Sequence, residues 1–281
     1  MTKISILGCG WLGLPLAKAL LEKGFSVNGS TTSTEKLSVL ENSGISPFLI
    51  NLTPALSKGE GVETVHTIET FFKDTETLII DIPPRLRGNP SDPSTPLRKE
   101  FVEKIQTLIP FIEKSAVDNV LFISSTSVYG DAHEIITEET TPEPETENGR
   151  QLLLAEELLQ GNANFKTTIL RFGGLIGEDR QPVKFLAGRD NLENPKAPIN
   201  LIHQKDCIGI IQKIIELGIW EETFNAVTPF HPSREDYYTQ KAIELHLALP
   251  KFNPEKTSTK KTISSAKVEN LLDYTFAKPH L

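Results

Sequence analysis

The sequence predicts an α/β protein with a doubly wound parallel sheet, and two features of the chain predict it. Short runs rich in Ile, Leu, Val and Phe alternate with segments whose apolar residues recur every three to four positions. The short runs are continuously apolar, which is typical of strands buried on both faces of a parallel sheet. Strands that alternate with helices in this way predict a doubly wound arrangement. We expect strands at residues 3–7, 25–29, 45–50, 77–80, 119–123 and 166–170, and helices at 12–23, 34–42, 63–72, 98–115 and 150–160.

The regular alternation fades in the last third of the chain. A helix is expected at 206–217, a strand at 223–227 that returns to the sheet, and a helix at 233–247 capped by Ser233. We therefore expect a dinucleotide-type domain at 1–172, to which 204–228 returns, and a smaller, interleaved substrate lobe within 173–281. A proline-rich stretch at 83–96 and an acidic stretch at 133–147 are interpreted as surface loops, the second as a solvated face.

Composition narrows the class of protein. The 281 residues carry a formal net charge of −8, which argues against sequence-independent binding of nucleic acid. No apolar run approaches the roughly 20 residues of a membrane span, so no membrane association is expected. Cys9 and Cys207 lie far apart and have neither disulfide-framework nor zinc spacing. A reducing, cytoplasmic location and no metal site are therefore predicted.

The motif Gly8-Cys9-Gly10-Trp11-Leu12-Gly13 is a G-x-G-x-x-G between the first strand and the first helix. In this context the first glycine permits a tight turn, the second lets backbone approach a pyrophosphate, and the third lets the helix pack close to the strand. The helix N-terminus then favours the phosphate charge. The pattern predicts a Rossmann-type dinucleotide site; the alternative is a tight turn without a ligand.

The end of the second strand bears on which dinucleotide is bound. An Asp or Glu there would bond the adenosine ribose and favour NAD. The sequence instead has Ser30, Thr31 and Thr32, with Lys36 nearby and no acid before Glu35. Hydroxyls, helix amides and Lys36 suit a 2′-phosphate, so NADP is favoured over NAD.

Later segments carry a resemblance to a known family. Residues 121–130, LFISSTSVYG, resemble the end of the fifth strand in extended short-chain dehydrogenases/reductases, a group that includes nucleotide-sugar epimerases and dehydratases. Further likeness lies at 149–156, 169–177, 200–206 and 224–227, so that it extends over about residues 3–247. With the glycine loop, these stretches are fairly specific for the family, but they identify no substrate.

The resemblance implies a catalytic arrangement that this chain matches only in part. A family Ser or Thr bonds the substrate oxygen, and Ser125 fills that position. A family Tyr acts as acid/base with a Lys four residues on, because an unassisted phenol with a pKa near 10 is a poor base. Here those positions hold Asn148 and Leu152. The chain therefore resembles the atypical branch, which lacks the Tyr–Lys pair.

Two other tyrosines, Tyr129 and Tyr237, are candidates to replace the missing one. Tyr129 either donates to a substrate oxygen beside Ser125 or is simply packed with a satisfied hydroxyl, and the second alternative is favoured. Tyr237 and Lys241 have Y-x-x-x-K spacing but lie too late in the chain, so we interpret them as coincidence. Residues expected to contact the cofactor are Gly8, Gly10, Trp11, Leu12, Gly13, Ser30, Thr31, Thr32, Lys36, Ile82, Pro83, Ser124, Phe172 and Gly173.

Two functions follow from these observations. The first is an NAD(P)-dependent reductase or epimerase-like enzyme on a small, polar, sugar-like substrate, with Ser125 and Tyr129 as catalytic candidates. The second is a non-catalytic dinucleotide-binding redox sensor or regulatory protein, which the missing Tyr–Lys pair supports. The resemblance also implies a possible homodimer through the helices at 98–115 and 150–160; a monomer is equally compatible.

Overall fold

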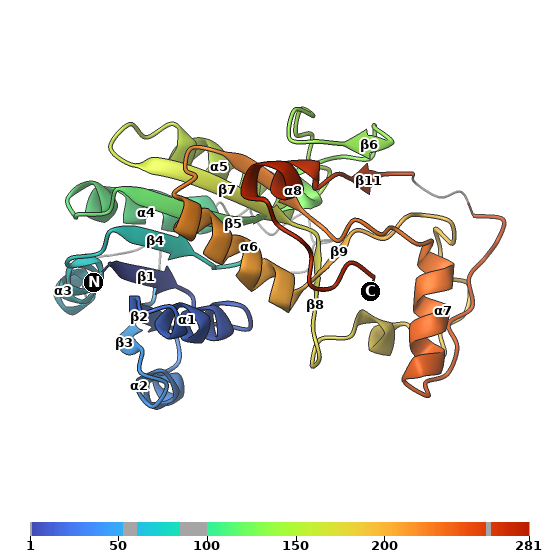
Figure 1. The fold of residues 1–281 in the computed structure, drawn as a ribbon, viewed down its shortest axis with the longest axis horizontal. Helices are drawn as coiled ribbons and strands as arrows, with labels where there is room; N and C mark the ends of the chain where they lie inside the picture. The colour runs from blue at the N-terminus through green and yellow to red at the C-terminus, as the bar shows by residue number, and fades with distance from the viewer. Residues whose placement is uncertain (1, 53–60, 85–99, 257–259, 281) are drawn as a thin grey trace, which may run out of the picture. The chain divides into compact units, whose positions relative to one another are not determined.

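The computed structural model describes residues 2–52, 61–84, 100–256 and 260–280 and contains a seven-stranded parallel sheet. The strand order is β10-β7-β5-β4-β1-β2-β3, and Figure 1 shows these strands side by side from β3 through β1 and β4 to β7. The predicted fold class is confirmed. The strands are β1 (Lys3–Leu7), β2 (Ser26–Thr31), β3 (Ser46–Leu49), β4 (Thr77–Ile80), β5 (Asn119–Ser125), β7 (Lys166–Phe172) and β10 (Thr223–Ala226).

Helices connect these strands as the periodicity predicts. They are α1 (Gly13–Glu22), η1 (Thr34–Lys36) with α2 (Leu37–Glu41), α3 (Gly61–Phe72), α4 (Glu100–Glu113), α5 (Glu147–Gln160), α6 (Gln204–Leu217) and α7 (Arg234–Glu244). A further helix, α8 (Ala266–Leu272), was not predicted. In α1 the stripe Leu16, Ala17 and Leu20 is fully buried. The helix ends before Gly24, whose φ of +87° is a conformation that favours glycine.

Short elements that the sequence analysis did not predict complete the fold. They are η2 (Thr126–Val128), β6 (Ile135–Ile136), β8 (Gly174–Ile176), η3 (Pro182–Phe185), β9 (Leu201–His203) and β11 (Thr262–Ile263). β6 pairs with β11, and β8 pairs with β9, both in parallel. The acidic stretch at 133–147, expected to be a loop, therefore contains the short strand β6. Most of the proline-rich stretch at 83–96 lies outside the described residues.

The chain forms two compact units. The first contains residues 1–128, 144–170 and 214–223, and the second 129–143, 171–213 and 224–281. This division differs from the expected one: 129–143, 171–172, 204–213 and 224–228 lie in the second unit. The pairings of β6 with β11 and of β8 with β9 lie inside the second unit.

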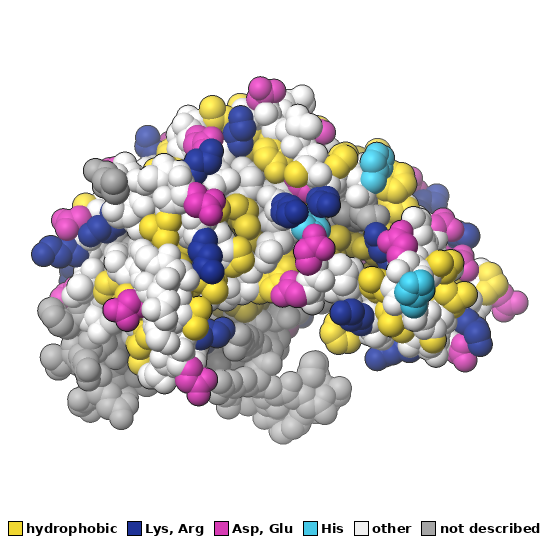
Figure 2. All heavy atoms as spheres, turned by 60° about the horizontal axis from the view of Figure 1, so that its bottom comes forward, with side chains coloured by type: hydrophobic (Ala, Val, Ile, Leu, Met, Phe, Trp, Pro, Cys, Tyr) yellow, Lys and Arg dark blue, Asp and Glu magenta, His cyan; other side chains and the backbone are white. Residues whose placement is uncertain are grey.

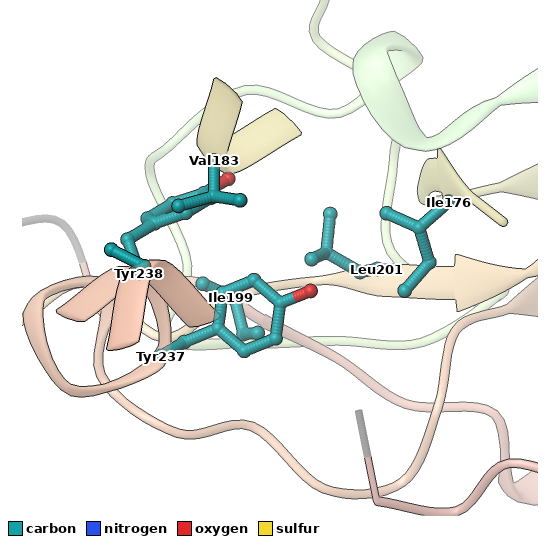
Figure 3. Packing of buried hydrophobic residues seen from close by; sticks show 7 residues of the cluster. Ile176, Val183, Ile199, Leu201, Tyr237 and Tyr238 are labelled. Atoms are coloured by element: carbon teal, nitrogen blue, oxygen red, sulfur yellow. The ribbon is translucent and has the colours of Figure 1, made fainter. Parts of the chain in front are cut away.

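The second unit has its own apolar core (Figure 3). Tyr237 and Tyr238 of α7 meet edge to face, with ring centroids 5.0 Å apart, and Val183 of η3 lies beside them. Ile176, Ile199, Leu201 and Ala242 complete this buried cluster. Ser233 caps α7 by accepting a hydrogen bond from the Asp236 amide at 3.1 Å, as predicted.

Surface charge is mixed on the face shown in Figure 2, where Lys and Arg side chains are interspersed with Asp and Glu. In the described parts of the chain, every helix is too short or too polar to cross a lipid bilayer.

Candidate dinucleotide site

The three glycines of the motif between β1 and α1 have different surroundings. Gly8 has φ of +108°, and a Cβ there would collide with the carbonyl oxygen of Asp81. A Cβ on Gly13 would collide with the carbonyl oxygen of Gly8, so α1 starts directly on the turn. A Cβ on Gly10 would meet nothing within 4 Å, so the space beside it is open. This geometry fits a pyrophosphate-binding turn.

Trp11 and Leu12 lead into α1. The Leu14 amide donates to the Gly10 carbonyl at 3.2 Å and the Leu16 amide to Leu12 at 3.1 Å, so helical bonding begins at the loop. Leu12 is buried, whereas Trp11 is half-buried. Leu12 therefore offers a ligand its backbone rather than its side chain, and the positive end of the α1 dipole favours an anion at this place.

The loop lies where the strand order reverses. β1 pairs with β2 on one side and with β4 on the other, and Leu7 is in register with Ile80. Directly after β4, the Asp81 amide donates to the Leu7 carbonyl at 2.9 Å. Ile82 comes within 3.0 Å of the position that a Cβ on Gly8 would take. Open α/β sheets bind ligands at this reversal point, outside the carboxyl ends of the strands.

Asp81 is a residue of this loop that the sequence analysis missed. Its carboxyl accepts a hydrogen bond from the Gly13 amide, and Oδ2 lies 3.1 Å from the position of a Cβ on Gly13. Burial raises the pKa of Asp81 to about 8, although the Gly13 hydrogen bond opposes the rise. The pKa of Cys9 is raised to about 12 by burial and then by the Asp81 charge, so Cys9 is a neutral thiol at physiological pH. No motif marked Asp81, because its proximity to the loop depends on β4 pairing with β1.

Hydroxyls at the end of β2 support the loop from within. Ser30 is buried, and its Oγ accepts a hydrogen bond from the Gly8 amide at 2.9 Å. Thr31 is also buried, and its Oγ1 accepts from the Ser33 amide at 3.1 Å. Thr32 and Lys36 are exposed. Of the four residues predicted to surround a 2′-phosphate, Thr32 and Lys36 are thus the ones whose side chains face solvent.

At the end of β5 the two serines have different surroundings. Ser124 is buried, and its Oγ donates to Oε1 of the buried Glu156 on α5 at 2.5 Å. Ser124 thus points to the helix, which differs from the predicted contact with a cofactor. Ser125 is half-buried, and its Oγ accepts from the Ser127 amide at 3.1 Å. Pro83, after β4, is exposed and has no amide donor to offer.

The start of α5 packs against the segment that follows Ser125. A Cβ on Gly149 would collide with the Ser127 carbonyl oxygen. Asn148 is exposed and Leu152 is buried on this helix. Asn148 and Leu152 therefore lie on the helix that packs directly against the segment after β5.

In the second unit, Tyr129 is buried with its hydroxyl occupied. Arg171 Nη1 donates to the hydroxyl at 2.6 Å, and the hydroxyl donates to Asn225 Oδ1 at 3.0 Å. The guanidinium also stacks over the ring at 4.9 Å. Burial raises the pKa of Tyr129 despite the nearby cation. These contacts favour the packed alternative over a catalytic one. Glu138 Oε1 accepts a hydrogen bond from the backbone amide of Asn225 at 2.7 Å. Glu138 belongs to the acidic stretch 133–147, which was expected to face solvent, but its side chain bonds within the second unit.

Two further candidates lie in the second unit. Phe172 ends β7 and is buried, so it would offer a cofactor only its backbone. A Cβ on Gly173 would lie 2.5 Å from the Asn200 carbonyl oxygen and 2.6 Å from Val227 Cγ1. Glycine is required there for close packing within the unit.

The Tyr237–Lys241 spacing does not form an acid/base pair. Tyr237 lies in the core of the second unit (Figure 3), and burial raises its pKa. Lys241 bonds Glu244 at 2.8 Å. Across residues 2–52, 61–84, 100–256 and 260–280, no group of three or more His, Cys, Asp or Glu side chains is placed to hold a metal ion.

The fold and the glycine loop define a Rossmann-type nucleotide-binding protein, and sequence comparison identifies its family. The model of the NAD dependent epimerase/dehydratase family matches residues 4–189. Protein YeeZ of Escherichia coli (strain K12) is 32% identical over 280 residues, which are 99% of this chain and 97% of that protein. The chain therefore belongs to the NAD dependent epimerase/dehydratase family, as the resemblance predicted.

Solved structures agree on the fold. A UDP-glucuronic acid 4-epimerase from Bacillus cereus, in complex with UDP-glucuronic acid and NAD, superimposes with a TM-score of 0.78 at 20% identity. The match covers 98% of this chain and 94% of the epimerase. A short-chain dehydrogenase/reductase superfamily protein from Agrobacterium tumefaciens with bound NAD gives 0.76 at 18% identity, covering 98% and 92%.

Proposed function

We propose that the protein is an NAD(P)-dependent oxidoreductase or epimerase-like enzyme acting on a small, polar, sugar-like substrate. The observation that carries the proposal is the open space beside Gly10. Gly8 and Gly13 are needed because a Cβ on either would collide with backbone of the protein, whereas no atom of the protein explains the glycine at position 10. Family membership and the bound NAD of the two solved neighbours support it. When bound, the nicotinamide supplies hydride transfer.

The chain's own residues would divide the remaining tasks. The loop from Gly8 to Gly13 holds the pyrophosphate, and the exposed Thr32 and Lys36 favour a 2′-phosphate and hence NADP. Ser125 orients the substrate oxygen. Proton exchange falls to water, because Asn148 and Leu152 cannot titrate and the Tyr129 hydroxyl is occupied.

A redox sensor is the second candidate. It is favoured by one observation: Asn148 and Leu152 of α5 stand where the family resemblance implies a Tyr and a Lys. A two-part screen separates the two functions: polar carbonyl compounds are offered with reduced cofactor, and sugar derivatives are offered with oxidised cofactor and analysed for their epimers. Net cofactor oxidation or epimer formation identifies the enzyme, and cofactor binding with neither product favours the sensor.

The proposal is tested by thermal unfolding with NADPH, NADP, NADH and NAD, using wild type and Gly10→Ala. A ligand at 100 times its dissociation constant stabilises by about 2.7 kcal/mol, or ~5–10 °C for a chain of this size. We expect a larger shift with the phosphorylated pair. Gly10→Ala should unfold like wild type without ligand, because its Cβ meets nothing, yet lose at least about tenfold in affinity, or about 1.4 kcal/mol.

Gly8→Ala is the contrasting variant. It should lose both stability and binding, because its Cβ collides with Asp81 and its φ is positive. No shift of wild type with any of the four dinucleotides, or an undiminished shift of Gly10→Ala, would overturn the proposal.

A further inference from the structure

The segment 274–278 of the second unit is seated on α6. Tyr274 lies against Gly209 of this helix, because a Cβ on Gly209 would collide with the Tyr274 hydroxyl. Asp206, in the first turn of α6, is fully buried and accepts hydrogen bonds from that hydroxyl and from two backbone amides of the same segment. The conformation of the first turn of α6 therefore decides whether the segment is held.

His203 caps this turn from the end of β9, and only its neutral form can do so. The residue directly precedes α6, and its Nδ1 accepts a hydrogen bond from the backbone amide of Lys205 at 3.1 Å. A ring nitrogen that accepts carries no proton, so the single ring proton is on Nε2. In the protonated ring both nitrogens are donors, and the bond from the Lys205 amide cannot form. A positive charge at this place also opposes the dipole of α6.

The charged groups that face His203 come from three parts of the second unit. Lys205 and Asp206 belong to α6, Lys278 to the segment, and Glu178 follows β8. Glu178 Oε1 lies 3.8 Å from Nε2, but its side chain is 81% exposed, so solvent screens the attraction. Burial is the largest cause of a lowered pKa of His203, and the two lysines act in the same direction, against the two acids.

We propose that His203 is an acid-sensitive cap of α6 and that its protonation releases residues 274–278 from Asp206. The proton on Nδ1 removes the acceptor of the Lys205 amide, so the turn that contains Asp206 loses its cap. The new charge also repels Lys278 and competes for the Asp206 carboxylate, which the segment's donors now share. This inference does not depend on the proposed dinucleotide site, because every residue in it belongs to the second unit.

The direction of the pH dependence follows from the lowered pKa. The stability that the cap contributes is fully present above the ordinary value of 6.5, and it is lost as pH falls through the lowered pKa of the folded state. In the released segment the ring regains its ordinary pKa and is mostly protonated at pH 6. Release should therefore become easier by up to about fourfold at pH 6 relative to pH 8.

The test is amide hydrogen exchange at Ala277 and Lys278 at pH 8 and pH 6, corrected for the intrinsic effect of pH on exchange. In wild type we expect the protection of both amides to fall by up to about fourfold at pH 6. His203→Asn keeps a side-chain acceptor at the cap but cannot titrate, so its protection should be equal at both pH values. His246→Asn, which removes an exposed histidine of the same unit, should behave like wild type.

Equal protection at both pH values in wild type would overturn the inference, as would a fall of the same size in His203→Asn. If that variant does not fold, a measurement on wild type decides. The ring signals of His203 are followed by NMR as the pH is lowered from 8, together with the amide signals of Ala277 and Lys278. Titration of the ring below 6.5, with amide shifts at the same midpoint, supports the inference. Titration at or above 6.5, or amide signals that do not follow the ring, contradicts it.

Discussion

Buried polar side chains at the ends of β5 and β7 are joined in hydrogen-bonded groups. Ser124 bonds Glu156 in the first unit, and Tyr129 joins Arg171 to Asn225 in the second. Every member of the two groups is buried, so the loss of one partner costs more than the net value of the bond itself. These contacts hold the ends of the strands in place.

Tyr129→Phe tests this interpretation at the residue scale. Removal of the hydroxyl leaves the Arg171 guanidinium and Asn225 Oδ1 without that partner, so we expect a loss of ~1–3 kcal/mol in the free energy of unfolding, measured by urea denaturation. Dinucleotide affinity should not change. A variant that is as stable as wild type but loses turnover would instead assign the hydroxyl to catalysis.

At the scale of the element, α5 shows how packing reverses an ordinary helix preference. Thr146 caps the helix by accepting from the Gly149 amide at 3.1 Å. Glycine is normally the weaker helix former, yet at position 149 it allows the helix to touch the Ser127 carbonyl. The start of α5 is thus fixed directly against the segment that follows Ser125.

Gly149→Ala should therefore destabilise the protein, although alanine favours helices by up to about 1 kcal/mol over glycine. We expect a net loss of ~1–3 kcal/mol from the collision with Ser127, seen as a lower Tm. Asn148→Ala, one position earlier and exposed, is the matched control and should be neutral or slightly stabilising. A rise in Tm for Gly149→Ala would show that the helix start can move away from Ser127.

At the scale of the whole chain, residues distant in sequence complete the second unit. Asp206, in the first turn of α6, is fully buried and accepts from the Tyr274 hydroxyl at 2.9 Å, the Ala277 amide at 2.6 Å and the Lys278 amide at 3.1 Å. Thr228 Oγ1 also contacts the Lys278 carbonyl at 3.1 Å. The segment 274–278 is thereby held to a helix about 70 positions earlier in the chain.

Asp206→Ala should free this segment. Because three donors lose a charged acceptor, we expect a loss of ~2–5 kcal/mol in the free energy of unfolding and faster amide hydrogen exchange at Ala277 and Lys278. Glu269→Ala, which removes an exposed acid of α8, is the control and should change neither. Unchanged exchange in Asp206→Ala would mean that apolar contacts alone hold the segment.

Local periodicity in the sequence was sufficient to predict the seven strands, the main helices and the turn at Gly8, Gly10 and Gly13. Each of these depends on residues adjacent in the chain, so its signal is local. The two- and three-residue strands β6, β8, β9 and β11 were not predicted, because so few residues carry no period and such strands exist only through pairing. For the same reason the boundaries of the two units could not be read from the sequence.

Only the tertiary structure decided which side chains meet at the loop and which are buried. The pairing of β4 with β1 brings Asp81 to the glycines, the packing of α5 directs Ser124 to Glu156, and the contacts of Tyr129 occupy its hydroxyl. The sequence alone determined the fold class and the family resemblance, because these depend on residue identity at known spacing. Burial and hydrogen bonding depend on contacts between residues far apart in the chain, and no local pattern specifies them.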